Sequence, residues 1–282
     1  MNELNNCKQL NVYPQKDSAQ INHFPQKKAI VVTFIWRDMT LKERCFLRQN
    51  VKMLRNHPFC VVHPKTYSVN YLKKEYPELM FMALDDSNFR SVWTYNNMML
   101  SPWFYNMFVD YEYMLICQID AYVFSDQLDY WVSLGYDYIG APWMLNDKPY
   151  ERLIGQWVIR LLKLQPIHNN RLHSAHLFHN VGNGGFCLRR ISKMKEIMER
   201  NQDLIKSVRG KHERMEDVFI SIILKKKEKL NIPNWRKALY FSFEKAPAWC
   251  LHLTKGIFPF GCHDTNARYW DSFWKKYIPL EE

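Results

Sequence analysis

The stretch AIVVTFI, from Ala29 to Ile35, is a continuous apolar run, too short for a membrane span. Such runs are typical of strands that are buried on both faces of a parallel sheet. Similar short runs occur at residues 59–62, 79–84 and 113–117, and segments 41–54 and 92–108 between them have apolar residues at helical spacing. Strand–helix–strand repetition favours parallel pairing through right-handed crossovers. The sequence therefore predicts an α/β fold with a Rossmann-type, mostly parallel sheet flanked by helices.

The second half of the chain is less regular. It contains a short segment at 136–139, a strand-like run at 186–188 and helical patterns at 192–206 and 216–229. We find no internal repeat and no linker rich in glycine and serine, so we expect a single domain. Residues 1–26 are polar and resemble a flexible leader.

Composition narrows the cellular setting and the partners. The seven cysteines form no C-x-x-C pair, which favours a reducing compartment. The N-terminus lacks a secretory hydrophobic core, and no apolar run approaches the roughly 20 residues of a membrane span, so we expect a cytoplasmic protein. The net charge of +11 favours an anionic partner. Nucleic acid, anionic lipid and the diphosphate of a sugar nucleotide are all anionic and are all candidates for this partner.

Ligands of open α/β sheets bind at the carboxyl ends of the strands. This rule places residues 33–38, including Thr33 and Arg37, in one cleft with residues 118–120, His63, Asp85 and Asp86. Asp120 ends the run at 113–117, where a carboxylate can bind a divalent cation that bridges two phosphates. The alternative is an aspartate that caps a neighbouring turn.

Two further motifs lie in the second half. Glu216 and Asp217 precede an apolar helical pattern, where one of them could act as general base on an acceptor hydroxyl. The alternative is a pair of acids that the helix dipole favours at a first turn. The segment VGNGG at 181–185 includes Asn183, Gly184 and Gly185, and its glycines permit close approach of the backbone to a ligand. It does not match the phosphate-loop or dinucleotide fingerprints, and a plain turn is the alternative.

Residues 151–164, ERLIGQWVIRLLKL, form an amphipathic helical pattern with arginine and lysine on the polar face. A basic polar face opposite Trp157 and several leucines suits a helix lying on an anionic membrane. A surface helix packed on the core has the same pattern.

Six segments occur in a fixed order along the chain: Tyr95-Asn96, CQIDAYVF at 117–124, YDYIGAPW at 136–143, VGNGGFCLR at 181–189, Glu216-Asp217 and PFGCH at 259–263. Taken together, they resemble a bacterial family known only as a domain of unknown function and related to GT-A glycosyltransferases. The resemblance spans roughly residues 30–263, and the combination of segments is more specific than any one of them.

The resemblance implies a GT-A-like domain over 27–282, with a nucleotide-binding half at 27–143 and an acceptor half at 180–282. Residues 144–179 are then an insertion. It implies transfer of a sugar from a nucleotide-sugar donor to a glycan or lipid-linked acceptor in bacterial surface polysaccharide assembly. The donor would contact Thr33, Arg37, Gln118, Asp120 and the loop residues Asn183, Gly184 and Gly185.

GT-A enzymes commonly carry D-x-D, but here Gln118 occupies the first position and only Asp120 matches the second. The family pattern supplies His263 as a late metal ligand, so a Mn²⁺ or Mg²⁺ ion would bind Asp120 and His263. Asp217, with Glu216 as the alternative, would be the base of an inverting reaction.

Two functions of other classes remain open at this stage. A basic protein with 15% aromatic residues could bind single-stranded nucleic acid, but the aromatics fall within apolar runs rather than between arginines. A glycoside hydrolase would use two carboxylates and water, and it has no need of the glycine-rich loop.

Overall fold

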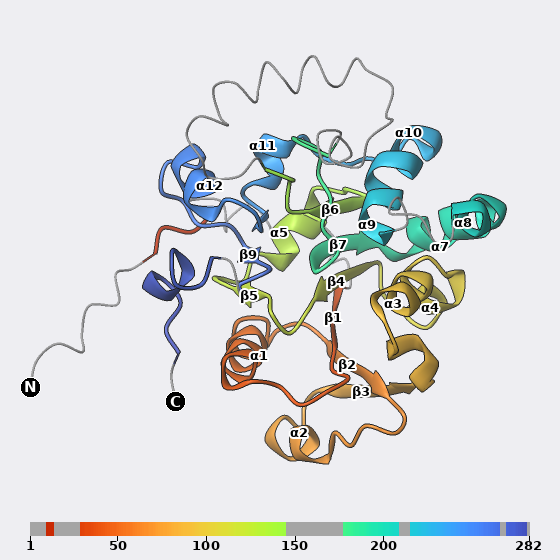
Figure 1. The fold of residues 1–282 in the computed structure, drawn as a ribbon, viewed down its shortest axis with the longest axis horizontal. Helices are drawn as coiled ribbons and strands as arrows, with labels where there is room; N and C mark the ends of the chain where they lie inside the picture. Colours follow the sequence, from red (N-terminus) through yellow and green to blue (C-terminus); the bar gives the residue numbers. More distant parts are fainter. Residues whose placement is uncertain (1–9, 14–28, 145–176, 209–214, 266–268, 281–282) are drawn as a thin grey trace, which may run out of the picture.

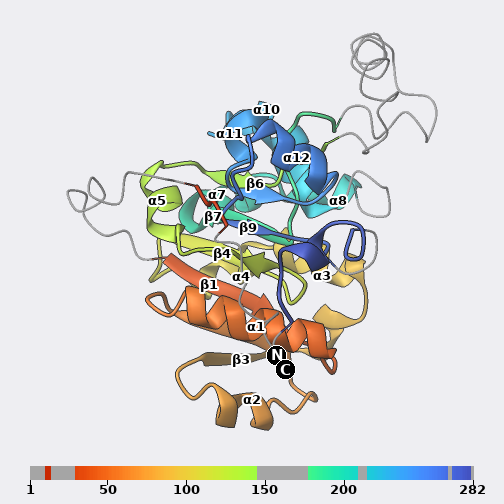
Figure 2. The same ribbon diagram turned by 90° about the vertical axis from the view of Figure 1, so that its left-hand side faces the viewer.

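A computed structural model describes residues 10–13, 29–144, 177–208, 215–265 and 269–280. Its centre is a six-stranded sheet in the order β3-β2-β1-β4-β7-β6. The strands are β1 (Ala29–Phe34), β2 (Phe59–Pro64), β3 (Met80–Leu84), β4 (Tyr113–Cys117), β6 (Tyr138–Gly140) and β7 (Phe186–Arg190). Figure 2 shows this order from β3 near the lower edge to β6 near the top.

The first four strands pair in parallel, as the apolar runs predict. β7 inserts between β4 and β6 and runs antiparallel to both. The sheet is therefore parallel from β3 to β4 and antiparallel at the edge formed by β7 and β6. The fold is a single mixed α/β domain.

Helices cover both faces of the sheet (Figure 1). Alternate residues of β1 point to opposite faces, so Val31 packs in one hydrophobic core and Ile30 and Val32 pack in the other. The first core is covered by α1 (Leu41–Met53), α2 (Asn70–Glu75) and α5 (Leu128–Ser133). The second is covered by α3 (Val92–Met99), α4 (Pro102–Asn106), α7 (Ile191–Arg200) and the π-helical segment Phe219–Leu224.

Three predicted helices are interrupted in the structure. The pattern at 92–108 divides into α3 and α4 because Pro102, at the start of α4, has no N–H with which to continue the helix. The pattern at 192–206 divides at Asn201 into α7 and α8 (Gln202–Val208). The pattern at 216–229 becomes α9 (Glu216–Val218), the π-helical segment and α10 (Lys225–Glu228).

A second, three-stranded sheet lies beside the first and brings the C-terminal part to the carboxyl end of β4. Its order is β5 (Tyr122–Val123), β9 (Gly261–Cys262), β8 (Ser242–Phe243), with β9 antiparallel to β5 and parallel to β8. The helices α11 (Trp235–Ala238) and α12 (Pro247–Leu253) flank β8 in the chain. This small sheet is what positions the site.

Part of the polar leader packs on the domain. Val12 forms a bridge with Phe258, and the Tyr13 hydroxyl lies 2.9 Å from that of Tyr130. The rest of the leader and the amphipathic segment 151–164 lie outside the described residues. Within the described ranges, no helix is both long and apolar enough to span a bilayer.

Candidate functional site

Asp120 and His263 meet at the carboxyl end of β4. Asp120 follows β4, and His263 follows β9, which the second sheet pairs with β5 directly after Asp120. The distance between Asp120 Oδ1 and His263 Nε2 is 3.2 Å, although the two residues are far apart in sequence. The predicted approach of His263 to Asp120 is confirmed.

Gln118 is the third member of this group. Its Oε1 lies 3.2 Å from His263 Nε2, and its Nε2 donates to the Tyr95 hydroxyl at 3.2 Å. The backbone N–H of Gln118 donates to the carbonyl of Gly185 at 2.9 Å, which ties the end of β4 to the glycine-rich loop. Gln118 therefore takes the place of the missing first carboxylate as a neutral oxygen.

Burial and charge oppose each other in the Asp120–His263 pair. Burial alone would lower the pKa of His263, but neighbouring carboxylates, Asp120 foremost, outweigh it and raise that pKa to about 9. Burial would raise the pKa of Asp120, but the positive charge and hydrogen bond of His263 hold it below its usual value. Asp120 and His263 therefore each favour the charged form of the other.

The glycine-rich loop passes so close to His263 that it needs glycine. A Cβ on Gly185 would lie 2.1 Å from His263 Nε2, which is sterically forbidden. Asn183 has a positive φ of 62°, and its Oδ1 accepts from the backbone N–H of Gly185 at 2.8 Å. This left-handed conformation costs free energy for a non-glycine residue and is typical of functional sites.

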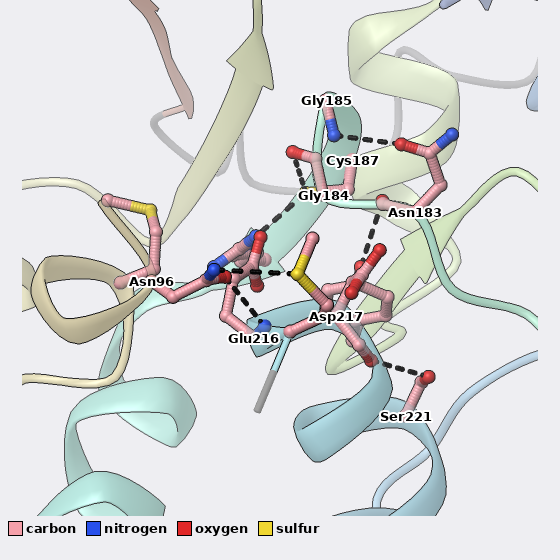
Figure 3. A network of polar contacts seen from close by, with 12 residues as sticks. Asn96, Asn183, Gly184, Gly185, Cys187, Glu216, Asp217 and Ser221 are labelled. Carbon is pink, nitrogen blue, oxygen red and sulfur yellow. Dashed lines mark hydrogen bonds and ion pairs between the residues drawn. The ribbon is translucent and has the colours of Figure 1, made fainter. Parts of the chain in front are cut away.

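Glu216 is engaged in a buried ion pair. Its Oε1 and Oε2 accept from Arg189 Nη2 at 2.9 and 2.8 Å, and the two side chains are 3% and 0% exposed. Its backbone N–H donates to Asn96 Oδ1 at 2.8 Å (Figure 3). Burial raises the pKa of Glu216 to about 7, against the opposite effect of Arg189. A Cβ on Gly184 would lie 1.9 Å from Glu216 Oε1, so this loop closes over the pair.

Asp217, the next residue, is half-buried and has a different environment. Its carboxylate accepts from the backbone N–H of Val218 at 2.8 Å and lies against the backbone of Gly184 (Figure 3). Its own carbonyl accepts from Ser221 at 2.6 Å. Burial raises the pKa of Asp217, and these backbone donors act against the rise. Of the two acids, only Asp217 has no cationic side chain hydrogen-bonded to it in the described part of the chain.

The two predicted donor-binding residues in and after β1, Thr33 and Arg37, have different environments. Thr33 is 1% exposed inside β1, so its side chain offers almost no surface to a ligand. Arg37 lies after β1, pairs with Glu43 at 2.7 Å and interacts electrostatically with Asp120. It lines an open hollow of about 620 Å³ together with Thr40, Leu41, Lys42, Glu43, Trp270 and Leu280.

The remaining residues of the predicted cleft lie farther along the sheet. His63 is the penultimate residue of β2 and is 6% exposed, with Nδ1 2.8 Å from the carbonyl of Pro64. Asp85 and Asp86 follow β3, the edge strand, and Asp86 accepts from the backbone of Thr66. The sheet order places β1 between them and β4, so they are not neighbours of Asp120.

Sequence reasoning missed Glu244. It follows β8, and the parallel pairing of β8 with β9 places it beside His263, which follows β9. In the sequence it is an isolated acid after a short aromatic segment, and no motif singles it out.

The distances from His263 to Asp120 and to Gln118 match the spacing of ligands around a divalent cation. Two ligand atoms in adjacent positions of an octahedral ion, each about 2.1 Å from it, lie roughly 3 Å apart. The distances from His263 Nε2 to Asp120 Oδ1 and to Gln118 Oε1 are both 3.2 Å. No group of three His, Cys, Asp or Glu side chains suited to a metal occurs among the described residues. An ion here would therefore complete its shell with substrate or water oxygens.

The family described as "Protein of unknown function (DUF5672)" matches residues 78–263. The chain belongs to this family. The match includes Asp120, the glycine-rich loop, the acidic pair and His263. No curated protein sequence matches the chain.

Two solved structures that are similar to this chain are glycosyltransferases. The glycosyltransferase GlyE of Streptococcus pneumoniae TIGR4 has a TM-score of 0.52 at 12% identity, over 90% of this chain and 61% of its own. The galactosyltransferase LgtC, solved with donor and acceptor sugar analogues, has a TM-score of 0.48 at 14% identity, over 86% and 89% of the two chains. At such identity the likeness to GlyE shows the fold alone, which is that of GT-A glycosyltransferases.

Proposed function

We propose that this protein is a glycosyltransferase that moves a sugar from a nucleotide-sugar donor to a glycan or lipid-linked acceptor, with inversion. One observation carries the proposal. The fold brings Asp120, Gln118 and His263 together at the carboxyl end of a central strand, directly against a glycine-rich loop. Open α/β sheets bind phosphorylated ligands at this position.

The donor's diphosphate would lie beside Asp120 and His263. A Mg²⁺ or Mn²⁺ ion held by Asp120, His263 and Gln118 would neutralise the negative charge that develops on the leaving diphosphate. Arg37 adds a positive charge on the same side, and the hollow that it lines has the size of a small-molecule pocket. Asn183, Gly184 and Gly185 would contact the donor through their backbone.

Asp217 is the base that we propose for the acceptor. An acceptor hydroxyl attacks the anomeric carbon, the bond from that carbon to the diphosphate oxygen breaks, and its electron pair leaves with the diphosphate. Asp217 takes the proton of the hydroxyl, and its raised pKa brings it nearer to working pH. Glu216, the other candidate, has both carboxylate oxygens hydrogen-bonded to Arg189 and stabilises the folded structure instead.

The cellular setting extends the same proposal. We place the enzyme in the bacterial cytoplasm, in surface polysaccharide assembly, with 27–143 as the nucleotide half and 180–282 as the acceptor half. The insertion 144–179, of which residues 145–176 lie outside the described residues, would contact anionic membranes through its basic helix 151–164. Liposome co-sedimentation that weakens with salt and with Trp157→Glu would support that contact, and salt-independent absence of binding would contradict it.

The decisive experiment is a ligand panel read by thermal shift and calorimetry. Nucleoside diphosphates and their sugar nucleotides are tested with and without Mn²⁺, on the wild type and on Asp120→Asn. A ligand at 100 times its Kd stabilises the folded state by about 2.7 kcal/mol. One nucleotide should stabilise the wild type and lose most of its effect on Asp120→Asn. No stabilisation by any nucleotide would contradict the proposal, and the best binder then enters a transfer assay.

A further inference from the structure

Three buried polar atoms gather beside the Asp120–His263 pair without a hydrogen-bond partner in the described ranges. They are Asn183 Nδ2, Glu244 Oε2 and His263 Nδ1. Asn183 is only 3% exposed, so water reaches its amide poorly. A buried polar group left without a partner costs free energy, roughly 1–3 kcal/mol. Three such atoms at one place indicate a ligand that supplies the missing partners.

The backbone explains why these atoms converge. Phe243 pairs with Cys262 in the parallel β8–β9 ladder, and the backbone N–H of His263 donates to the carbonyl of Phe243 at 3.0 Å. Glu244 and His263 therefore leave adjacent strands at the same end. Asn183 reaches them through the loop, because Gly185 is in contact with the His263 ring. Its amide lies close enough to Glu244 to lower the pKa of that carboxyl, but the two side chains do not meet the full geometry of a hydrogen bond.

The hydrogen-bonding capacities of Glu244 Oε2 and Asn183 Nδ2 match hydroxyl groups of a ligand. Glu244 Oε2 accepts a hydrogen bond and Asn183 Nδ2 donates one, while a sugar hydroxyl does both. A phosphate oxygen would be repelled by Glu244 and by Asp217, whose carboxylates interact electrostatically with each other. Two neighbouring hydroxyls of one sugar ring match a carboxylate and an amide side by side.

The position of Glu244 and Asn183 in the site indicates that they contact the transferred sugar rather than another part of the donor. Glu244 interacts electrostatically both with His263, on the diphosphate side, and with Asp217, the proposed base. In an inverting transfer, the sugar that moves lies between the leaving diphosphate and the base. Glu244 and Asn183 therefore lie where that sugar has to be.

We propose that Glu244 and Asn183 bind two adjacent hydroxyls of the transferred sugar and select a neutral sugar. This inference rests on the proposed function. Glu244 accepts from one hydroxyl, Asn183 Nδ2 donates to the other, and the negative charge of Glu244 excludes a uronic acid.

The test compares each nucleoside diphosphate with its sugar nucleotide on the wild type, Glu244→Gln and Glu199→Gln. Glu199 is an exposed acid on α7 and serves as the matched control. Glu244→Gln should bind the nucleoside diphosphate as the wild type does and bind the sugar nucleotide roughly 10- to 100-fold more weakly, the size of a lost hydrogen bond to a charged group. Its melting temperature without ligand should not fall, because burial raises the pKa of Glu244 and the amide removes that charge.

A uronic-acid donor supplies the second measurement. Relative to the neutral sugar nucleotide with the same base, it should bind better to Glu244→Gln than to the wild type. An unchanged preference between the neutral sugar and the uronic acid in Glu244→Gln would overturn the inference. Equal loss of nucleoside diphosphate and sugar nucleotide binding would also overturn it, because Glu244 would then only support the fold. Failure of the wild type to bind any nucleoside diphosphate would instead overturn the proposed function itself.

Discussion

Replacing Glu216 by alanine tests whether this acid belongs to the fold or to the chemistry. The change removes both hydrogen bonds to Arg189, at 2.9 and 2.8 Å, and leaves a guanidinium that is 0% exposed without its carboxylate. Removing one partner of a buried ion pair typically costs about 3–5 kcal/mol. In a domain of this size each kcal/mol lowers Tm by roughly 2–4 °C, so we expect a fall of roughly 6–20 °C.

The assay is urea and thermal unfolding followed by circular dichroism. Glu196→Ala is the control, because Glu196 forms exposed ion pairs with Arg200 and Lys193 on α7, and such pairs are worth about 0–1 kcal/mol. The double variant Arg189→Met/Glu216→Leu removes both charges and should be more stable than Glu216→Ala alone. If Glu216→Ala loses no more stability than Glu196→Ala, the structural role of Glu216 is refuted. It would then return as a candidate base.

Four further predictions concern the reaction. Asp217→Asn should lower kcat by roughly 100-fold or more, the size of a lost general base, with sugar-nucleotide binding by calorimetry nearly unchanged; a drop in affinity alone would contradict the role. Because burial raises the pKa of Asp217, wild-type kcat should fall with decreasing pH through a pKa above the usual range of aspartate, and Asp217→Asn should lack this acidic limb. Gly185→Ala places a methyl group 2.1 Å from His263 Nε2 and displaces the His263 ring from Asp120. Mn²⁺-dependent donor affinity should then fall on the order of 10- to 100-fold, the usual effect of losing a residue that orients a metal ligand. An unchanged affinity would show that His263 does not belong to the site. NMR of the product should show the anomeric configuration opposite to that of the donor, and an identical configuration would exclude inversion whatever the variants do.

The sequence alone determined the parallel half of the sheet. The runs at 29–35, 59–62, 79–84 and 113–117 predicted β1 to β4, because a strand buried on both faces has to be apolar along its whole length. The strand-end rule then placed Asp120 at the carboxyl edge of the sheet, since the carboxyl ends of parallel strands share one edge. The approach of His263 followed from the Gly-x-His ending of the aromatic tail, from the missing first carboxylate at Gln118, and from the late histidine of some GT-A enzymes.

Tertiary structure alone decided which of two adjacent acids is free. The sequence predicted Asp217 as the base, with Glu216 as the alternative. In the structure, helical geometry turns neighbouring side chains about 100° apart, and Glu216 meets Arg189 from β7. The contact between Glu216 and Arg189 exists because β7 inserts antiparallel between β4 and β6. The apolar residues of β7 do not by themselves indicate which strands it pairs with. Glu244 likewise gains its neighbours only from the register of β8 with β9. Local patterns specify burial and periodicity, whereas a contact between distant side chains depends on how the chain returns to the sheet.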